Sequence, residues 1–353
     1  MRPLWCRFLW TVAIFLNSPF YIVHSSSAAV APSRLARYEL KCLVCRHTFT
    51  AVTCLEANKS EGIDRDLFAR SVGPQPEYYR IATCPKCGYS GYDADFDASL
   101  VIPPDVRDKI LKKPRLKLPK GFTPAGDPLD LDAADRYELA ITCYRWRQCS
   151  DEAVAWLHLR ASWIARDEGS VLPPDERLVR VMKFIERWRP PATPQDNQSD
   201  LEMQMVTRIA EAIETGRFSR YQKPYVELAL AMILRRHGEN RQASPLIDRL
   251  ADYKEFSPAL RDAVRRMRDS IPLERKHQAE AADRLERALL AGQIKAPNQG
   301  TARYLLGELN RRLGRDRQAV AWFDKVLASP ELPADLKTWA GQQRAGCLAE
   351  DQR

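Results

Sequence analysis

Four cysteines with the spacing of metal ligands are the strongest chemical signal in this sequence. Cys42-Leu-Val-Cys45 forms one C-x-x-C pair, and Cys84-Pro-Lys-Cys87 forms a second pair after a gap of 38 residues. A C-x-x-C turn places two thiolates on one side of a metal ion, and two such turns supply the tetrahedron of soft ligands that Zn²⁺ prefers. The sequence therefore predicts a Zn²⁺ site with Cys42, Cys45, Cys84 and Cys87 as its ligands.

The two cysteine turns differ in the residue that follows them. Gly88 suits a turn that needs a positive φ at this point, and Pro85 presets the same turn. Arg46 stands in the equivalent place of the first pair, so this turn is predicted to be the less ideal one. Because 38 residues exceed the usual spacing of a zinc ribbon, an excursion over roughly residues 57–76 must leave the ribbon and return to it.

Other roles for the cysteines are alternatives to zinc binding. In an oxidising compartment the two pairs could form structural disulfides. A Cys-Pro-x-Cys sequence can also be a redox centre, but such centres sit at a helix N-terminus in a βαβ unit, and the sequence shows no such pattern. Cys54 and His47 are expected to be bystanders, and Cys6 is expected to be removed with a predicted N-terminal signal peptide. The remaining cysteines are predicted to be small buried hydrophobes: Cys143, Cys149 and Cys347.

Short strands are expected to position the cysteine pairs. Apolar and polar residues alternate over residues 38–40 and 48–52, so residues 36–100 are predicted to form a small β-rich zinc-ribbon-like domain.

Three aspartates near the end of this domain have the D-x-D-x-D spacing of a calcium loop: Asp93, Asp95 and Asp97. Ala98 replaces the glycine that such a loop needs, and Pro104 stands where a bidentate glutamate belongs. The aspartates are therefore predicted to lie in a solvated strand or turn.

The N-terminal 31 residues read as a signal peptide. Arg2 and Arg7 precede the nine-residue apolar run Phe8–Leu16, and Ala29-Val30-Ala31 forms a small-residue cleavage site. The expected location is therefore the periplasm or cell envelope, with no transmembrane span after cleavage. A cytoplasmic location is the alternative if the N-terminus is a mis-assigned start.

Composition and charge exclude several classes of protein. The 353 residues are 45% hydrophobic and 29% charged, which argues against both a disordered chain and a polytopic membrane protein. The formal net charge is +9, and residues 101–121 concentrate it with seven basic and two acidic side chains. Prolines interrupt residues 101–128, which are predicted to form a basic, extended linker. A contact with phosphate or anionic lipid is the alternative for this segment.

Helical periodicity dominates from residue 129 onward. Residues 129–190 are predicted to form a divergent helical repeat segment, and residues 199–350 a set of helical repeats, with the break Pro190–Ser199 between two packets. The candidate helices are 129–148, 151–167, 174–189, 200–216, 223–237, 240–252, 258–270, 273–292, 299–313, 316–328 and 334–348.

Two helix pairs repeat the same offsets at a distance of 76 residues. Leu306-Gly307, Ala319 and Phe323 correspond to Leu230-Ala231, Ala243 and Ile247. This pattern resembles the tetratricopeptide repeat, although Arg303 and Asn310 stand where that family places Trp and Tyr. The fold class is thus predicted to be mainly α, a tetratricopeptide-like α-solenoid of antiparallel helix pairs with a small N-terminal β-rich zinc ribbon.

No catalytic constellation can be assembled from the sequence. The five histidines are scattered, and neither a phosphate loop nor a dinucleotide fingerprint is present, so an enzyme is not expected. His158 is interpreted as a core or rim residue. The tryptophans of the divergent segment are predicted to fill its core: Trp146, Trp156 and Trp163.

The N-terminal half also resembles a known family. The C-x-x-C pair, the insert segment Gly62–Leu67, the segment Tyr78–Tyr89 containing Cys-Pro-Lys-Cys-Gly-Tyr, and Asp95-Phe96 are similar to domain-of-unknown-function family 2225 of bacteria. This resemblance covers about residues 36–190. It implies a bacterial source and a metal-knuckle head on a helical body, and it implies no reaction.

These observations favour a non-enzymatic, exported scaffold whose helical repeats bind a protein or peptide partner. A nucleic-acid-binding zinc-ribbon protein that uses residues 107–120 is one alternative. A thiol-redox protein that uses the C-x-x-C pairs is the other.

Overall fold

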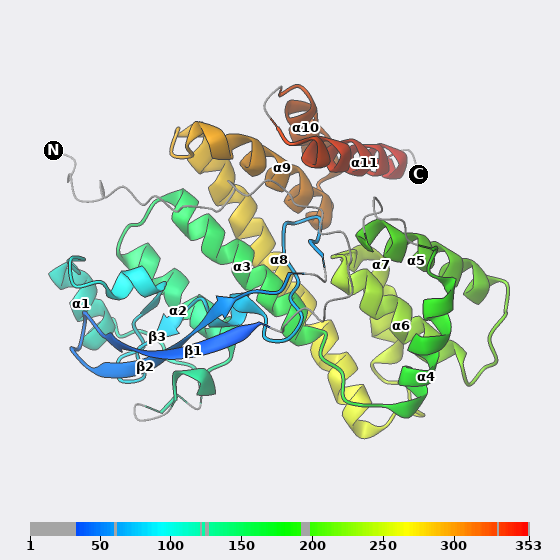
Figure 1. Cartoon of the computed structure of the whole chain (residues 1–353), viewed down its shortest axis with the longest axis horizontal. Helices are drawn as coiled ribbons and strands as arrows, with labels where there is room; N and C mark the ends of the chain where they lie inside the picture. Colours follow the sequence, from blue (N-terminus) through cyan, green and yellow to red (C-terminus); the bar gives the residue numbers. More distant parts are fainter. Residues whose placement is uncertain are drawn as a thin grey trace.

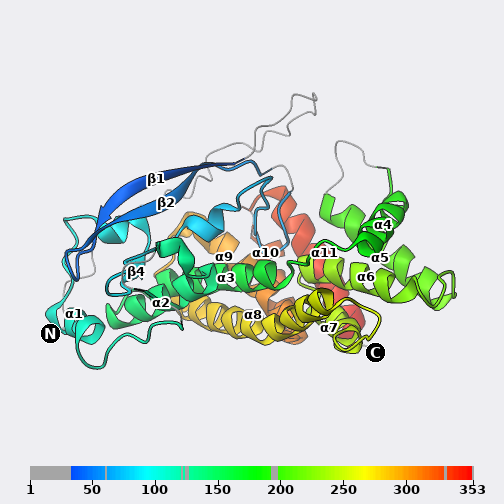
Figure 2. The same ribbon diagram turned by 90° about the horizontal axis from the view of Figure 1, so that it is seen from below.

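A computed structural model describes residues 33–59, 62–120, 122–123, 127–191, 198–329 and 332–351. The predicted signal peptide lies outside the described residues. A β-rich head with α1 occupies one end of the molecule, and a helical body extends from it (Figure 1, Figure 2). The strands are β1 (Arg34–Lys41), β2 (Thr48–Glu56), β3 (Ala82–Thr83) and β4 (Ser90–Gly91), and the helices are α1 (Pro104–Leu111), α2 (Ala133–Trp146), α3 (Asp151–Gly169), α4 (Glu176–Ile185), α5 (Gln198–Glu214), α6 (Lys223–Arg236), α7 (Asn240–Leu250), α8 (Pro258–Leu290), α9 (Ala296–Leu313), α10 (Asp316–Leu327) and α11 (Ala334–Asp351).

Two antiparallel strand pairs build the head. β1 pairs with β2, and in this register Leu40 lies opposite Phe49. Side chains alternate between the two faces of a strand, so Phe49 and Ala51 are buried while Thr50 is exposed. β3 and β4 form the second, shorter pair. The predicted short strands are confirmed.

The segment predicted as an extended linker is instead packed onto the head. Residues 104–111 form α1, so the prediction of an extended spacer was wrong there. Val106 and Ile110 on one face of α1, together with Leu116, are buried in the same apolar cluster as the cysteines. Val106 and Ile110 are four residues apart in α1, which places them on one helix face.

The helical body has two packets joined by a central pair of helices. α8 packs along α3, and Figures 1 and 2 show the two helices side by side through the middle of the molecule. α4–α7 form one packet and α9–α11 the other. The predicted division at Pro190–Ser199 was wrong, because α4 and α5 on either side of it both pack against α6. The mainly helical fold with a small β-rich head is confirmed.

One helix boundary was also wrong. Residues 258–270 and 273–292 were expected to be separate helices broken at Pro272, but α8 is one helix of 33 residues that contains this proline. Proline removes one backbone hydrogen bond and disfavours a helix interior. Pro272 is exposed, so the freed carbonyl can be hydrated. Ile271 and Glu274, on either side of it, are buried, and this packing keeps the helix continuous.

The repeat offsets correspond to close helix packing. An added Cβ on Gly307 of α9 would lie 2.5 Å from the Phe323 ring of α10, so only glycine permits this approach of the two helices. Ala243 and Ile247, at the equivalent places in α7, are fully buried. Assignment to the tetratricopeptide repeat and the solenoid class stays a prediction. None of the helices in the described part of the chain is long and apolar enough to cross a membrane.

Candidate metal centre

The four predicted ligands come from two turns with the same backbone pattern. Cys42 and Cys45 lie in the turn between β1 and β2, and Cys84 and Cys87 lie in the turn between β3 and β4. In the first turn the Arg46 N–H donates to the Cys42 carbonyl at 2.9 Å. In the second turn the Gly88 N–H donates to the Cys84 carbonyl at 2.8 Å. Each hairpin therefore presents its pair of sulfurs toward the other.

The residue after each cysteine pair has a left-handed backbone. Gly88 has φ 78°, as expected from its type, and Arg46 reaches φ 62° although it carries a side chain. The arginine is exposed, so its side chain extends into solvent without a steric conflict inside the head. The first turn thus adopts the same geometry as the second at the energetic cost that a positive φ imposes on a non-glycine residue.

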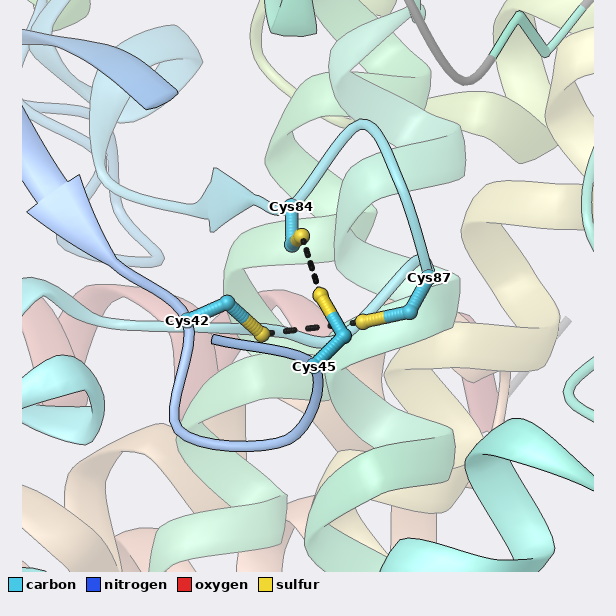
Figure 3. Close-up of side chains that lie close together, drawn as sticks. All are labelled: Cys42, Cys45, Cys84 and Cys87. Carbon is cyan, nitrogen blue, oxygen red and sulfur yellow. Dashed lines mark hydrogen bonds between the residues drawn. The ribbon is translucent and has the colours of Figure 1, made fainter. Parts of the chain in front are cut away.

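The sulfur atoms converge on one point (Figure 3). Cys42 Sγ lies 3.6 Å from Cys87 Sγ, and Cys45 Sγ lies 3.5 Å from Cys84 Sγ. All four ligand atoms are within 4.8 Å of one another. A tetrahedral zinc ion with Zn–S bonds of about 2.3 Å separates its sulfurs by about 3.8 Å. The arrangement therefore fits a four-thiolate metal ion.

Burial and mutual proximity determine the protonation of these thiols. Cys42, Cys84 and Cys87 are buried, and Cys45 is half-buried. Hydrogen bonds from Cys42 and Cys87 lower the pKa of Cys84, whereas the hydrogen bonds with Cys42 and Cys84 raise the pKa of Cys87. Thiolates this close together repel one another when they are ionised. A divalent cation would relieve the repulsion by compensating their negative charge. The donor set itself thus favours a bound cation.

Asp95 fastens the metal-centre hairpins to the helical body, and the prediction of a solvated turn was wrong for this residue. Its side chain is 2% exposed. It accepts hydrogen bonds from the Tyr144 hydroxyl at 2.5 Å, from Arg147 at 2.6 Å and from the Tyr92 N–H at 2.8 Å. Tyr144 lies in the last turn of α2 and Arg147 directly follows the helix, so a buried carboxylate links the head to α2. Its neighbours Asp93 and Asp97 are exposed, as expected.

The other candidate residues lie outside the sulfur cluster. Cys54 donates to the backbone carbonyl of Glu56, and His47 is half-buried without joining the four cysteines. Cys143 and Cys347 are buried as predicted, whereas Cys149 is half-buried. Trp163 is buried, and Trp146 and Trp156 are partly buried. Cys6 lies outside the described residues.

The insert between the two cysteine pairs reaches the centre of the helical body, a position that the sequence did not predict. The 57–76 excursion follows the end of β2, opposite the start of β1, and returns through β3 to the second cysteine pair (Figure 1). Phe68 at its tip is fully buried and stacks on Trp163 of α3 at 5.4 Å between ring centroids. The Tyr304 hydroxyl of α9 donates to the Arg65 carbonyl at 2.8 Å.

Two aspartates of the insert enter a buried network of charges. Asp66 pairs with Arg166 of α3 at 2.8 Å and with Arg312 of α9 at 3.0 Å. Asp64 pairs with Arg70 at 2.8 Å and with Arg166 at 3.3 Å. Burial raises the pKa of Asp66, but the charges of Arg166 and Arg312 outweigh it and hold the pKa below its usual range.

The network continues into α6 and α8. Glu274 of α8 pairs with Arg235 of α6 and accepts a hydrogen bond from Asn240 at 3.0 Å. Both Glu274 and Arg235 are fully buried. The sequence signal for this site was present in the Asp64-Arg-Asp66 run of the insert, but the shared partner Arg166 lies about 100 residues away along the chain.

The fold and the cysteine site together define a class of protein, a helical body with a four-cysteine head that can hold a metal ion. Residues 35–271 and 272–345 match the family described as an uncharacterized protein conserved in bacteria, domain-of-unknown-function family 2225 (DUF2225), and the chain belongs to this family. The predicted resemblance is confirmed and extends beyond residue 190. The two matched segments meet at Pro272, inside α8. Neither the curated proteins nor the solved structures contain a match to this chain.

Proposed function

We propose that this chain is a non-enzymatic, exported scaffold protein in which Zn²⁺ stabilises the head and the helical repeats bind a protein or peptide partner. The observation that carries the proposal is the cluster of four cysteine sulfurs within 4.8 Å of one another. Four thiolates complete the coordination of tetrahedral zinc and leave no position for water or substrate, which is typical of structural sites.

The insert gives the metal centre a role beyond the head. The chain enters the 57–76 segment from the hairpin of the first cysteine pair and leaves it toward the second pair. Zinc would join the two hairpins that flank this segment while Phe68 and Asp66 engage α3 and α9. The metal would thereby help to fix the relative positions of the helices.

The helical body supports the interaction part of the proposal. Closely packed helix pairs such as α6–α7 and α9–α10 are the building units of arrays that bind partners over extended surfaces. The basic n-region, the apolar run and the cleavage site at the N-terminus support export.

Metal analysis of the reduced, full-length protein tests the zinc assignment. We expect about one zinc per chain, the ratio for a single four-thiolate site, and a clearly substoichiometric content would contradict the proposal. Cys84→Ser should release zinc and destabilise the fold. If this variant folds normally but loses thiol–disulfide exchange activity, the redox function is correct instead.

Affinity purification from the cell envelope tests the scaffold assignment. We expect a defined protein to co-purify with the wild-type chain and not with unfolded Cys84→Ser protein. Fractionation that places the intact N-terminus in the cytoplasm would contradict export.

A nucleic-acid-binding protein is the second candidate, and one observation favours it. Leu116 is buried and Leu118 is partly buried against the head. Arg115 precedes Leu116, Lys117 lies between the two leucines, and both basic residues are exposed. This candidate predicts salt-dependent binding to nucleic acid that weakens when Lys112, Lys113 and Arg115 are neutralised. Binding that is indifferent to salt would reject it.

A further inference from the structure

Aromatic and basic side chains, most of them exposed, gather where α4 meets the α5–α6 loop. We call this surface the aromatic corner and define it by Lys183, Phe184, Arg187, Trp188, Arg217, Phe218, Arg220 and Tyr221. It lies at the end of the molecule opposite α1 and the metal centre (Figure 1, Figure 2). Neither the metal centre nor the repeat packing accounts for it.

Ring contacts hold the aromatic corner together. Trp188 stacks on Phe218 with ring centroids 5.8 Å apart, and Phe184 contacts both rings at 5.9 and 6.3 Å. These contacts fix the α5–α6 loop against α4. Phe184 is nevertheless 43% exposed, and Tyr221 on the same loop is 55% exposed. The corner therefore presents apolar surface to solvent in a defined arrangement.

Two aliphatic side chains near the start of α4 are also exposed. Val179 is 47% exposed and borders a shallow hollow that is also lined by Pro174 and Arg180. Val171, in the segment that leads into α4, is 64% exposed. Large exposed hydrophobic residues in one region mark interaction surfaces more often than isolated ones do.

The charge of this region is positive and largely uncompensated. Residues 176–189 and 214–223 carry eight basic and three acidic side chains, a net charge of +5 within a C-terminal part that is otherwise nearly balanced. Arg180 pairs with Glu176, and Arg189 pairs with Glu186. Four further cations form no ion pair with any residue that the structure describes: Lys183, Arg187, Arg217 and Arg220.

We propose that the aromatic corner binds the surface of an anionic lipid bilayer. Basic side chains beside exposed aromatic and aliphatic groups suit the interface, where the cations meet lipid phosphates and the apolar groups enter the acyl boundary. A single-stranded nucleic acid would need free ring faces for stacking. Here the largest ring, Trp188, already has one face covered by Phe218, which favours the bilayer.

Co-sedimentation of the full-length, metal-loaded protein with lipid vesicles tests this proposal. We expect binding to vesicles of phosphatidylcholine mixed with phosphatidylglycerol, weaker binding at high salt, and little binding to phosphatidylcholine alone. Removing both charges in a Lys183→Gln/Arg187→Gln variant should reduce the partition coefficient about thirty-fold, because each basic side chain near an anionic surface contributes about 1 kcal/mol. Tyr221→Ser should also weaken binding, because Tyr221 would insert between lipids.

The matched control removes the same charge from the opposite end of the molecule. Lys112→Gln/Lys113→Gln should leave vesicle binding within a few-fold of wild type. If this control abolishes binding while Lys183→Gln/Arg187→Gln does not, the lipid contact belongs to the 107–120 segment and the proposal is wrong. Absence of vesicle binding together with salt-dependent binding of a single-stranded oligonucleotide through Lys183 and Arg187 would also overturn it.

Discussion

At the residue scale, the two cysteine turns adopt one backbone geometry with different residue types. Gly88 and Arg46 have the same left-handed φ and the same hydrogen bond to the first cysteine of their pair. What differs is the space around them. Gly88 lies under the side chains of Leu116 and Leu118, whereas Arg46 is exposed. Substitutions at the two positions should therefore have opposite effects.

We expect Gly88→Ala to destabilise the metal-loaded protein by about 1–3 kcal/mol, because an alanine there combines a positive φ with a steric overlap. Its Cβ would lie 2.3 Å from Cδ2 of Leu118. Arg46→Gly should stabilise by about 0.5–1 kcal/mol, because it relieves the left-handed strain of a non-glycine residue. Urea denaturation of both variants measures these free energies of unfolding. An equal loss of stability in both variants would show that the positive φ does not determine the stability of the turns.

Asp95 is a second test at the residue scale. Asp95→Asn should destabilise the protein by about 3–5 kcal/mol, because it leaves Arg147 buried without a counter-charge. Asp97→Asn is the matched control in the same D-x-D-x-D run, and it should change little because Asp97 is exposed. Thermal denaturation of the two variants compares them. Similar melting temperatures would contradict a structural role for Asp95.

At the element scale, the insert between the cysteine pairs connects elements that are far apart in sequence. Arg70 of the insert donates to the carbonyl of Arg236 at the end of α6, at 3.0 Å. Arg65 pairs with Asp200 of α5 and donates to Gln342 of α11 at 3.1 Å. One excursion from the head thus contacts both helical packets as well as α3.

Asp66 is the critical charge of this insert. Asp66→Asn should destabilise the protein by about 3–5 kcal/mol, because Arg166 and Arg312 lose the carboxylate that compensates them in the interior. Asp248→Asn on the exposed face of α7 removes the same charge and should have little effect. The comparison is made by urea denaturation at neutral pH. An Asp66 variant as stable as the control would exclude a role for the network in holding the insert.

The same carboxylate predicts an acid sensitivity. Arg166 and Arg312 lower the folded pKa of Asp66 below the unfolded value of about 3.9, so its contribution to stability is present above that value and is lost as the pH falls below it. Unfolding free energies measured from pH 6 downward should therefore decline in acid. The decline should be shallower in Asp66→Asn.

A buried histidine pair between α3 and α8 adds sensitivity at higher pH. His158 Nδ1 lies 3.0 Å from His277 Nδ1, and Arg145 lies 3.2 Å from the other ring nitrogen of His158. His277 faces Glu138 at 3.3 Å, and Glu280 lies 3.9 Å from His158. Burial, His277 and the neighbouring arginines Arg145 and Arg284 lower the pKa of His158 to about 3, so the folded protein keeps this ring neutral.

Stability should consequently fall as the pH drops from the unfolded histidine value of about 6.5 toward 3, since only the unfolded state takes up the proton. The expected slope is about 1.4 kcal/mol per pH unit from this group, and it should flatten in His158→Gln. Guanidine denaturation at a series of pH values measures the slope. An unchanged slope in the variant would mean that another group is responsible.

At the scale of the whole molecule, the metal centre, the insert and the two helical packets form a connected structure. The thiols lie in the same apolar cluster as Leu139 and Cys143 of α2, so the head has no core separate from the body. Metal removal should therefore affect helices that touch no cysteine.

Chelation of the reduced protein tests this connection. We expect a lower melting temperature and faster proteolysis within residues 57–76, because the two hairpins that flank the insert are no longer joined by one ion. Hydrogen exchange should also increase in α9, where Arg312 and Tyr304 contact the insert. If the increase in hydrogen exchange is confined to the cysteine hairpins, the head and the body are independent. If they are connected, adding zinc back should reverse the increase in α9.

The sequence by itself determined the parts of this protein that depend on local chemistry. The spacing of Cys42, Cys45, Cys84 and Cys87 predicted the cluster of four sulfurs, because a C-x-x-C turn is a local structure. Hydrophobic periodicity located most helices for the same reason. The predicted helix break at Pro272 was wrong, because buried neighbours on both sides keep α8 continuous.

Only the tertiary structure decided where the charged residues lie. Asp95 and Asp66 look like ordinary solvated carboxylates in the sequence, since neither has its arginine partner nearby along the chain. Folding brings Arg147 to Asp95, and Arg166 and Arg312 to Asp66, from elements remote in sequence. A charge can be buried when such a partner compensates it, and that compensation is a property of three-dimensional proximity rather than of residue spacing.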